Sequence, residues 1–308
     1  MDLASLILVA AISGGTSLLF AVLGGILNEK AGVINLGTEG IMLIGAVMSA
    51  IVFVQTNNLF ITFVVMLAAT GALGLLHAFL CITLRANQIV SGLAVTLFGT
   101  GLSAYIGKTV AGAAIPVTIP KVKLSFLESI PILNAFANLD LFIWISIILS
   151  IVLYFYMYKT SWGLHLKAVG DNPSTSDAMG ISVIGFRYFH VVIGSMLMGC
   201  AGFYLIMAYS PNWIEGMTSG RGWIAIALII FARWNPIYAL VGAYFFGGLD
   251  SLGFRMQNLD INIPSYFLKM IPYIATIVVL MFIGWKNRNR PSIEPKSLGN
   301  PYFREQRY

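Results

Sequence analysis

The sequence predicts an all-α protein that crosses a membrane about eight to ten times. Of its 308 residues, 58% are hydrophobic and only 10% are charged, whereas soluble proteins carry roughly 25% charged residues. The mean hydropathy is +0.86. Long apolar segments recur along the chain, and no polar stretch is long enough to form a globular domain outside the membrane. We therefore expect one membrane domain, residues 1–285, followed by a polar tail, residues 286–308.

Seven apolar segments are each long enough to cross about 30 Å of hydrocarbon. They are residues 3–27, 33–54, 59–84, 88–106, 140–158, 187–208 and 267–285. The first segment lacks a basic leader and a clear cleavage site, so we expect it to be an uncleaved span. Two shorter apolar pieces, 222–232 and 236–253, are separated by a break at Pro236, which cannot donate a helical hydrogen bond. The piece 222–232 is either a short tilted span or a half-helix.

Basic residues predict the orientation, because they accumulate on the cytoplasmic side. With nine crossings and an inside tail, twelve Lys and Arg residues lie inside and six lie outside. The two sides are equal without the tail, so the tail alone predicts a cytoplasmic C-terminus. In this arrangement the loop 107–139 lies outside and the loop 159–186 lies inside. Six of the eighteen basic residues fall in the last 23 positions, which does not indicate a nucleic-acid partner.

A polar stretch with three glycines, residues 29–40, lies between the first two apolar segments. A charge at the membrane is expensive and usually functional, so Glu39 should be paired, hydrated in a cavity, or protonated. Closely spaced glycines favour tight packing or non-helical backbone, which membranes tolerate only against protein or a water-filled cavity. We predict that Asn35, Thr38 and Glu39 line a transport pathway.

Further pathway candidates lie near the break at Pro236 and in the apolar piece that follows it. Arg233 and Asn235 directly precede this proline, and Asp250 follows a glycine pair at the end of its apolar run. The alternative for Asp250 is a surface ion pair with Arg255, five positions further on.

The loop 159–186 contains the start and stop signals of a short helix. Asp171 or Asn172 can cap its start, Pro173 suits the first turn, and Gly180 suits a left-handed stop. A helix of about seven residues is marginal alone in water. Either the membrane domain or a groove on a partner must therefore hold it.

The sequence gives little support for reactive cysteines, a metal site or ATP hydrolysis by this chain. Cys81 and Cys200 lie in separate apolar segments, which predicts buried free thiols. The three histidines do not have metal-ligand spacing. A P-loop needs four residues between its first glycine and Gly-Lys-Thr, but five separate Gly101 from Gly107. ATP hydrolysis therefore has to belong to another chain, and this chain is not expected to be an enzyme.

Three blocks in the chain resemble a known family, the ABC importer permeases that handle branched-chain amino acids, simple sugars and nucleosides. These blocks are residues 28–40, 166–181 and 222–236. Residues 246–257 and 263–273 are similar to the nucleoside subgroup, and more to its shorter permease. The chain departs from the family pattern at residues 174–176, where Ser-Thr-Ser replaces the usual alanines.

The resemblance implies a type II-like ABC importer permease fold with a cytoplasmic coupling helix that meets the ATPase. It assigns the coupling role to Gly170, Asp171, Asn172, Pro173, Asp177, Ala178 and Gly180. It also implies a nucleoside importer in a bacterial cell membrane, in which this chain pairs with a second, longer permease. The implied partners are an ATPase with two nucleotide-binding units, which binds ATP and Mg, and a lipid-anchored extracellular substrate-binding protein. This chain would itself bind no cofactor.

Two alternative functions remain open from the sequence. A simple-sugar importer permease belongs to the same class. A secondary transporter that works without ATP would instead use intramembrane carboxylates, Glu39 and Asp250, for ion coupling and would not need the capped cytoplasmic helix.

Overall fold

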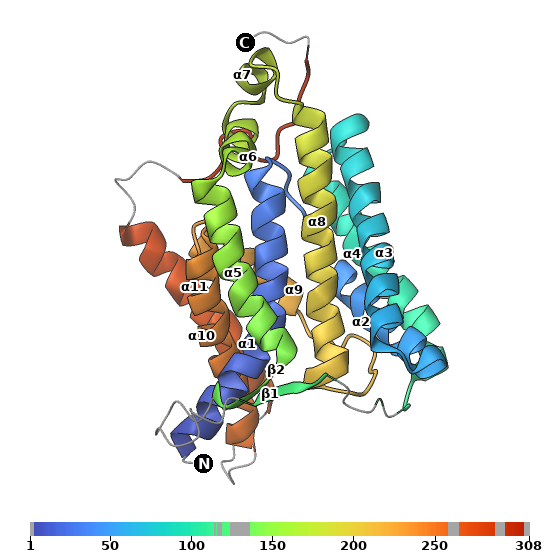
Figure 1. Ribbon diagram of the computed structural model, residues 1–308. Coiled ribbons are helices and arrows are strands. Elements are labelled where there is room, and N and C mark those ends of the chain that lie inside the picture. The colour runs from blue at the N-terminus through green and yellow to red at the C-terminus, as the bar shows by residue number, and fades with distance from the viewer. Residues whose placement is uncertain are drawn as a thin grey trace.

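The computed structural model describes residues 3–113, 115, 119–123, 136–257, 265–286 and 293–304 of the chain. Figure 1 shows a bundle of long helices in which α1 begins at one end and the described tail lies at the other. The helices are α1 (Leu3–Lys30), α2 (Thr38–Thr56), α3 (Leu59–Ala78), α4 (Gln88–Gly107), α5 (Leu141–Lys159), α6 (Ser161–Asp171), α7 (Pro173–Ala178), α8 (Val183–Tyr204), α9 (Arg221–Phe231), α10 (Pro236–Gln257) and α11 (Ser265–Lys286). Short helical segments named η1 (Phe79–Thr83), η2 (Lys108–Val110) and η5 (Leu205–Tyr209) continue α3, α4 and α8.

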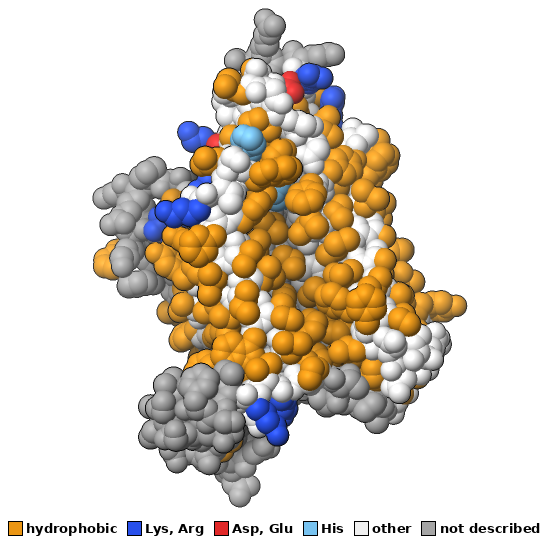
Figure 2. Space-filling model, in the orientation of Figure 1, with side chains coloured by type: hydrophobic (Ala, Val, Ile, Leu, Met, Phe, Trp, Pro, Cys, Tyr) orange, Lys and Arg blue, Asp and Glu red, His pale blue; other side chains and the backbone are white. Residues whose placement is uncertain are grey.

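The prediction of an all-α polytopic membrane protein is confirmed. Six helices among the described residues are long and apolar enough to cross a membrane: α1, α2, α3 with η1, α4 with η2, α5, and α8 with η5. Helices α10 and α11, of 22 residues each, complete the bundle. Figure 2 shows hydrophobic side chains over the middle of one face, with most of the visible Lys and Arg side chains toward its ends. This distribution suits a bundle whose middle is surrounded by lipid.

Contacts define two ends of the bundle. At the α7 end, where α7 lies, Ser297 of the tail donates its backbone N–H to the Gly170 carbonyl. At the opposite end, which we call the β end, strands β1 (Lys121–Lys123) and β2 (Asn138–Asp140) pair antiparallel. Helix order then gives nine passages among the described residues, if the interrupted segments 31–56 and 210–231 each count as one. As the sequence predicted, the tail and α7 lie at the same end (Figure 1).

The first interruption is residues 31–37, here called the break segment, between α1 and α2. The span predicted over 33–54 is therefore wrong at its start, because the second helix begins at Thr38. Side chains provide partners for the backbone groups that no helix satisfies. Gln88 Oε1 accepts from the Ile34 N–H at 2.7 Å, and the His77 ring lies 3.0 Å from the Ile34 carbonyl oxygen. The Thr96 hydroxyl donates to the Leu36 carbonyl at 2.7 Å. Non-helical backbone is tolerated at this depth because protein groups replace water.

The second interruption is residues 210–220, here called the re-entrant segment, between η5 and α9. Helix α9 has eleven residues, so it is only about 16 Å long at 1.5 Å per residue and is too short to cross a bilayer. Of the two alternatives for residues 222–232, the structure supports the half-helix. Helix α9 packs against α1, α2, α10 and α11, inside the protein.

Small residues let the central helix α1 approach its neighbours closely. A Cβ atom on Gly24 would lie 2.3 Å from the Gly194 carbonyl oxygen of α8, and one on Gly15 would lie 2.5 Å from the Ala243 carbonyl oxygen of α10. Membrane helices associate through such close backbone packing, since lipid supplies no hydrophobic drive between them. The two interruptions are thereby held against a fixed core formed by α1, α8 and α10.

Candidate functional site

The carboxylate of Glu39 joins the two interruptions. It stands in the first turn of α2, and its Oε1 accepts hydrogen bonds from the Thr218 hydroxyl at 2.5 Å and from the Gly220 N–H at 2.9 Å. Its Oε2 accepts from the Gly222 N–H at 2.6 Å. Glu39 is 8% exposed. This arrangement, here called the Glu39 latch, supplies an acceptor to backbone donors at the start of α9.

The Glu39 latch follows from the physics of helix ends. The first N–H groups of a helix have no partner within it, and the N-terminus carries partial positive charge. Glu39 satisfies two such N–H groups and places a negative charge where two helix N-termini, those of α2 and α9, come together. Gly222 permits the contact, because a Cβ atom there would lie 2.5 Å from the Glu39 backbone nitrogen. Among the alternatives considered for Glu39, the structure shows it hydrogen-bonded to neutral donors of its own chain.

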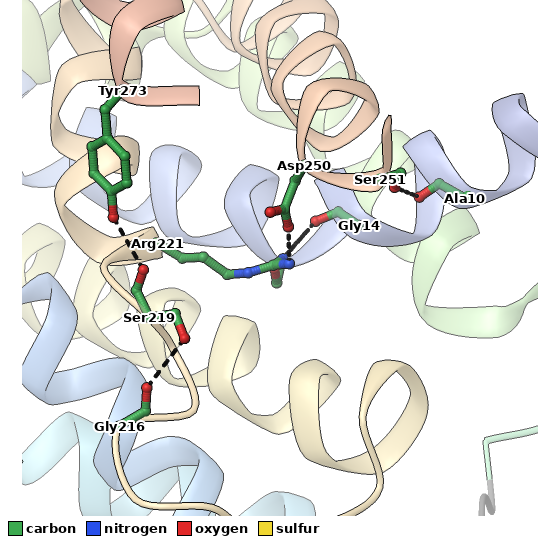
Figure 3. A network of polar contacts seen from close by, with 9 residues as sticks. Ala10, Gly14, Gly216, Ser219, Arg221, Asp250, Ser251 and Tyr273 are labelled. Carbon is green, nitrogen blue, oxygen red and sulfur yellow. Dashed lines mark hydrogen bonds and ion pairs between the residues drawn. The ribbon is translucent and has the colours of Figure 1, made fainter. Parts of the chain in front are cut away.

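A second polar cluster surrounds Arg221, the first residue of α9 (Figure 3). Its guanidinium donates to the Gly14 carbonyl at 2.8 Å and to the Ser17 hydroxyl at 2.9 Å, both on α1. It also forms a short ion pair with Asp250 of α10. The guanidinium carbon lies 4.9 Å from the centre of the Tyr209 ring. Arg221 thus ties the half-helix to α1 and α10, and Asp250 offsets a cation placed unfavourably at a helix N-terminus.

The Arg221 cluster forms one wall of a cavity of about 570 Å³. The cavity lies among α9, α10, α11, the re-entrant segment and the end of η5, and its wall is more apolar than polar. Aromatic side chains contribute from three directions: Tyr209, Phe246 and Tyr273. The Tyr273 hydroxyl donates to the Ser219 carbonyl at 3.1 Å and so holds α11 against the re-entrant segment. Mainly apolar walls with a few oriented polar groups are typical of small-molecule sites.

The predicted pathway residues divide into four groups, of which three lie toward the re-entrant segment and the break segment. Asp250 lines the cavity and is paired with Arg221, whereas the side chain of Arg255, the partner considered from the sequence, lies outside the described part of the chain. Glu39 lies beneath the re-entrant segment, at the start of α9. Asn35 and Thr38 are buried in the chain, where Asn35 Nδ2 donates to Ser195 at 3.4 Å.

Arg233 and Asn235 lie at the other end of α9 and do not join the cavity. Asn235 caps α10 by accepting the Ile237 N–H at 2.9 Å, and Arg233 and Trp234 adopt left-handed backbone with φ of 52° and 54°. The Trp234 indole donates to Glu29 at the end of α1, at 2.6 Å. These contacts explain the turn between α9 and α10. They give no support to a pathway role for Arg233 or Asn235.

The predicted short helix in the loop 159–186 is present as α7. Asn172 is its cap, since Oδ1 accepts the Thr175 N–H at 3.0 Å, and Pro173 is the first helical residue. Gly180 follows the helix with φ +81°, as the left-handed stop predicted. Ala178 is the last residue of α7 and is exposed, as are Ser174 and Thr175. The helix presents its outer face away from the membrane domain.

The described tail, residues 293–304, packs against the region predicted to couple to an ATPase. Ser297 Oγ donates to the Gly170 carbonyl at 2.6 Å, and the Lys296 N–H donates to Asp171 at 3.4 Å. Arg304 pairs with Asp177 of α7 at 3.0 Å. The chain's own tail, which neither alternative from the sequence named, therefore holds one flank of α7, while the outer face of α7 stays open.

The remaining sequence candidates have structural explanations. The P-loop-like Gly107 packs against the Trp213 indole, because a Cβ atom there would lie 2.2 Å from its Nε1. Cys81 and Cys200 are buried free thiols, as predicted. Within the described ranges, no group of three His, Cys, Asp or Glu residues could hold a metal ion. Pro116 and Pro131 of the loop 107–139 lie outside the described residues.

A buried half-helix, an adjoining small-molecule cavity and a protruding capped helix together define a membrane transport subunit. The family model described as "Branched-chain amino acid transport system / permease component" matches residues 7–282. The chain belongs to this family, and it is a permease component of an ABC transporter.

The names of similar proteins mention two kinds of substrate, sugars and nucleosides. The putative glucose ABC transporter permease protein TsgC13 of Haloferax volcanii is 38% identical, with 99% of each chain covered. The guanosine ABC transporter permease protein NupQ of Bacillus subtilis is 34% identical over 100% of this chain and 99% of its own. The nucleoside ABC transporter permease protein NupC of Lactococcus lactis is 33% identical over 94% of both chains. No solved structure matches the chain significantly.

Family membership overturns one alternative from the sequence, the secondary transporter that works without ATP. That alternative also needed free intramembrane carboxylates. Glu39 instead accepts three hydrogen bonds from its own chain, and Asp250 is paired with Arg221.

Proposed function

We infer that this chain is the shorter permease of a nucleoside importer and that its cavity is part of the substrate pathway. The observation that carries this proposal is the cavity wall, which combines Tyr209, Phe246 and Tyr273 with one charged pair. Aromatic faces suit a nucleobase, whereas a hexose offers hydroxyls on most of its surface and needs many polar partners. The names of NupQ and NupC agree with a nucleoside. A sugar is the second candidate, because TsgC13 is named for glucose.

The proposed pathway would be completed by a second permease. The cavity opens to the molecular surface beside exposed residues of the re-entrant segment, including Ile214 at 59% exposure. A single chain therefore encloses only part of a route. A second, longer permease covering this opening would bury it, and an extracellular binding protein would deliver the nucleoside at the β end.

An ATPase that binds ATP and Mg would dock at the α7 end and drive transport by hydrolysing ATP. In this account the coupling group comprises Gly170 to Pro173, Asp177, Ala178 and Gly180, and the exposed face of α7 docks on the ATPase. Movement of α7 would reach the half-helix through the α7 end of α1, because a Cβ atom on Gly170 would lie 2.2 Å from the Lys30 carbonyl oxygen. Tipping α9 about the Glu39 latch would then open and close the cavity.

Purification of the tagged full-length chain in a mild detergent tests the assembly. We expect a longer permease of the same family and an ATPase with two nucleotide-binding units to co-purify with it. Recovery of the chain as a stable homo-oligomer without an ATPase would contradict the proposed assembly.

Two substitutions in the coupling group should uncouple transport from ATP hydrolysis. Gly180→Pro forces φ near −65° where the backbone has φ +81°, and Asp177→Lys replaces the partner of Arg304 with a like charge. We expect nucleoside uptake and substrate-stimulated ATPase activity to fall at least about tenfold, while the amount of inserted protein is unchanged. Ser174→Ala, at an exposed position of the same helix, is the control. Full activity of both variants would remove α7 from the coupling role.

Cysteine labelling tests the proposed cytoplasmic position of the tail. Ser297, an obvious choice from sequence, is only 8% exposed beneath Gly170, so Lys296→Cys, which is exposed, is the better site. In a variant lacking Cys81 and Cys200, we expect a membrane-impermeant maleimide to label position 296 only after the cells are opened. Labelling in intact cells would reverse the proposed orientation.

A further inference from the structure

Three arginines from distant parts of the sequence line one recess at the α7 end. They are Arg85, before α4, Arg187, near the start of α8, and Arg304, in the tail. The inner lobe of the recess has a volume of about 40 Å³. An outer lobe of about 260 Å³ extends from it to α7, where Asp177 and Gly180 form its wall. Tyr302 and Arg304 line both lobes, so the two lobes are adjacent.

Arg187 is a buried cation whose described partners are all neutral. The residue is 1% exposed. Its guanidinium donates to the Ser297 hydroxyl at 3.1 Å and to the Asn300 carbonyl at 3.3 Å. Its Nε is buried with no hydrogen-bond partner in the part of the chain that the structure describes. Burial of a cation without an anion is costly, so this arginine is suited to accept an anion.

The other two arginines add to the positive charge of the recess. Arg85 is exposed, and its guanidinium lies 4.4 Å from the centre of the Phe303 ring. Arg304 pairs with Asp177, the one carboxylate that lines either lobe among the described residues. Burial and a hydrogen bond to the Asp177 carboxylate raise the pKa of the Tyr302 hydroxyl. Arginine forks and hydroxyl donors match the geometry of phosphate oxygens.

The size and position of the recess favour a phosphate on a lipid. A volume of 10–15 Å³ on this scale holds about one water, so the inner lobe, of about 40 Å³, suits a compact anion. The recess lies at the end of the apolar helices, and Leu84 and Ile184 beside it are 58% and 54% exposed. These side chains can contact acyl chains while the arginines hold the headgroup, as basic pockets between membrane helices do.

We propose that this recess binds the phosphate group of an anionic phospholipid. Arg85 and Arg187 hold the phosphate in the inner lobe, while Arg304 and Tyr302 bind it from the tail side. The bound lipid neutralises Arg187 and fixes the tail, and with it the flank of α7, to the membrane surface. The site is independent of the transported substrate. Inorganic phosphate has the same chemistry, so the test separates the two sources.

Native mass spectrometry of the purified full-length chain measures this binding. The probes are short-chain phosphatidylglycerol, phosphatidylcholine with the same acyl chains, and inorganic phosphate, each added in an uncharged detergent. We expect phosphatidylglycerol to bind with at least about tenfold higher affinity than phosphatidylcholine. Arg85→Gln and Arg304→Gln should each weaken phosphatidylglycerol binding about tenfold, since each removes charge-assisted hydrogen bonds. Both positions are exposed, so these variants are expected to fold even where Arg187→Gln does not.

Lys159→Gln is the matched control, because Lys159 is an exposed cation at the end of α5 and does not line the recess. This variant should bind phosphatidylglycerol like the natural chain. Inorganic phosphate binding with the same arginine dependence, and no preference for phosphatidylglycerol, would assign the site to a free anion. The proposal is overturned if neither anion binds, or if Lys159→Gln weakens binding as much as the arginine variants.

Discussion

Glu39→Gln is expected to lower nucleoside uptake at least about tenfold and to reduce the thermal unfolding midpoint of the purified chain by several degrees. The carboxylate accepts three hydrogen bonds, from Thr218, Gly220 and Gly222. An amide NH₂ in place of either oxygen faces a donor, so at least one buried donor loses its acceptor. The expected loss is about 2–3 kcal/mol, because hydrogen bonds to charged groups are stronger than neutral ones. Uptake at matched expression and thermal unfolding in detergent measure the two effects.

Substitutions of Thr218 measure how much its hydrogen bond to Glu39 contributes to stability and uptake. Thr218→Ser keeps the hydroxyl and should retain most of the stability and uptake, whereas Thr218→Val removes it and should cost about 1–2 kcal/mol. If Glu39→Gln behaves like the natural chain in both measurements, the carboxylate has no role in positioning α9. Loss of stability with normal uptake would restrict the Glu39 latch to a structural role.

The Arg221–Asp250 pair should show the second large effect. Its side chains are only 10% and 30% exposed. Arg221→Met leaves Asp250 without its partner and also frees the Gly14 carbonyl and the Ser17 hydroxyl. Breaking a fully buried pair by removing one partner costs about 3–5 kcal/mol, and the cost here should be at the lower end of this range or below it, because Asp250 borders the cavity. We expect Arg221→Met to express poorly and to unfold at a clearly lower temperature.

The double variant Arg221→Met/Asp250→Leu separates stability from transport. Replacing both members of a buried pair with apolar residues is often neutral for stability, so the double variant should recover much of the unfolding midpoint. Uptake should remain low, because the cavity loses its charged pair. Lys108→Met, which removes an exposed cation at the β end, should change neither quantity. Equal, additive losses in a double-mutant cycle would show that the two residues do not interact.

The sequence predicted the features that depend on local signals. The apolar lengths predicted the spans, and Asn172, Pro173 and Gly180 predicted α7. The shortness of residues 222–232 left the half-helix as one of two alternatives. Each of these depends on residues within a few positions of one another. The glycines around Glu39 likewise marked the break segment, although the start of α2 was placed five residues too early.

Contacts between distant residues could not be predicted in this way. The partners of Glu39 are about 180 positions away, and Asp250 pairs with Arg221, which precedes it by 29 positions. Nothing local in the sequence pointed to the Gly14 carbonyl as an acceptor for Arg221. The packing of the tail on Gly170 and Arg187 was also missed, because a polar tail contains no periodic pattern. Three-dimensional packing alone brings these groups together.

Uptake of radiolabelled guanosine into cells that produce the intact transporter tests the central claim most directly. Cells lacking this chain should lose the uptake, and the natural chain should restore it. We predict that excess unlabelled nucleosides compete with the label while excess glucose does not. Undiminished uptake in cells lacking this chain, or competition by glucose alone, would contradict the assignment of this permease to nucleosides.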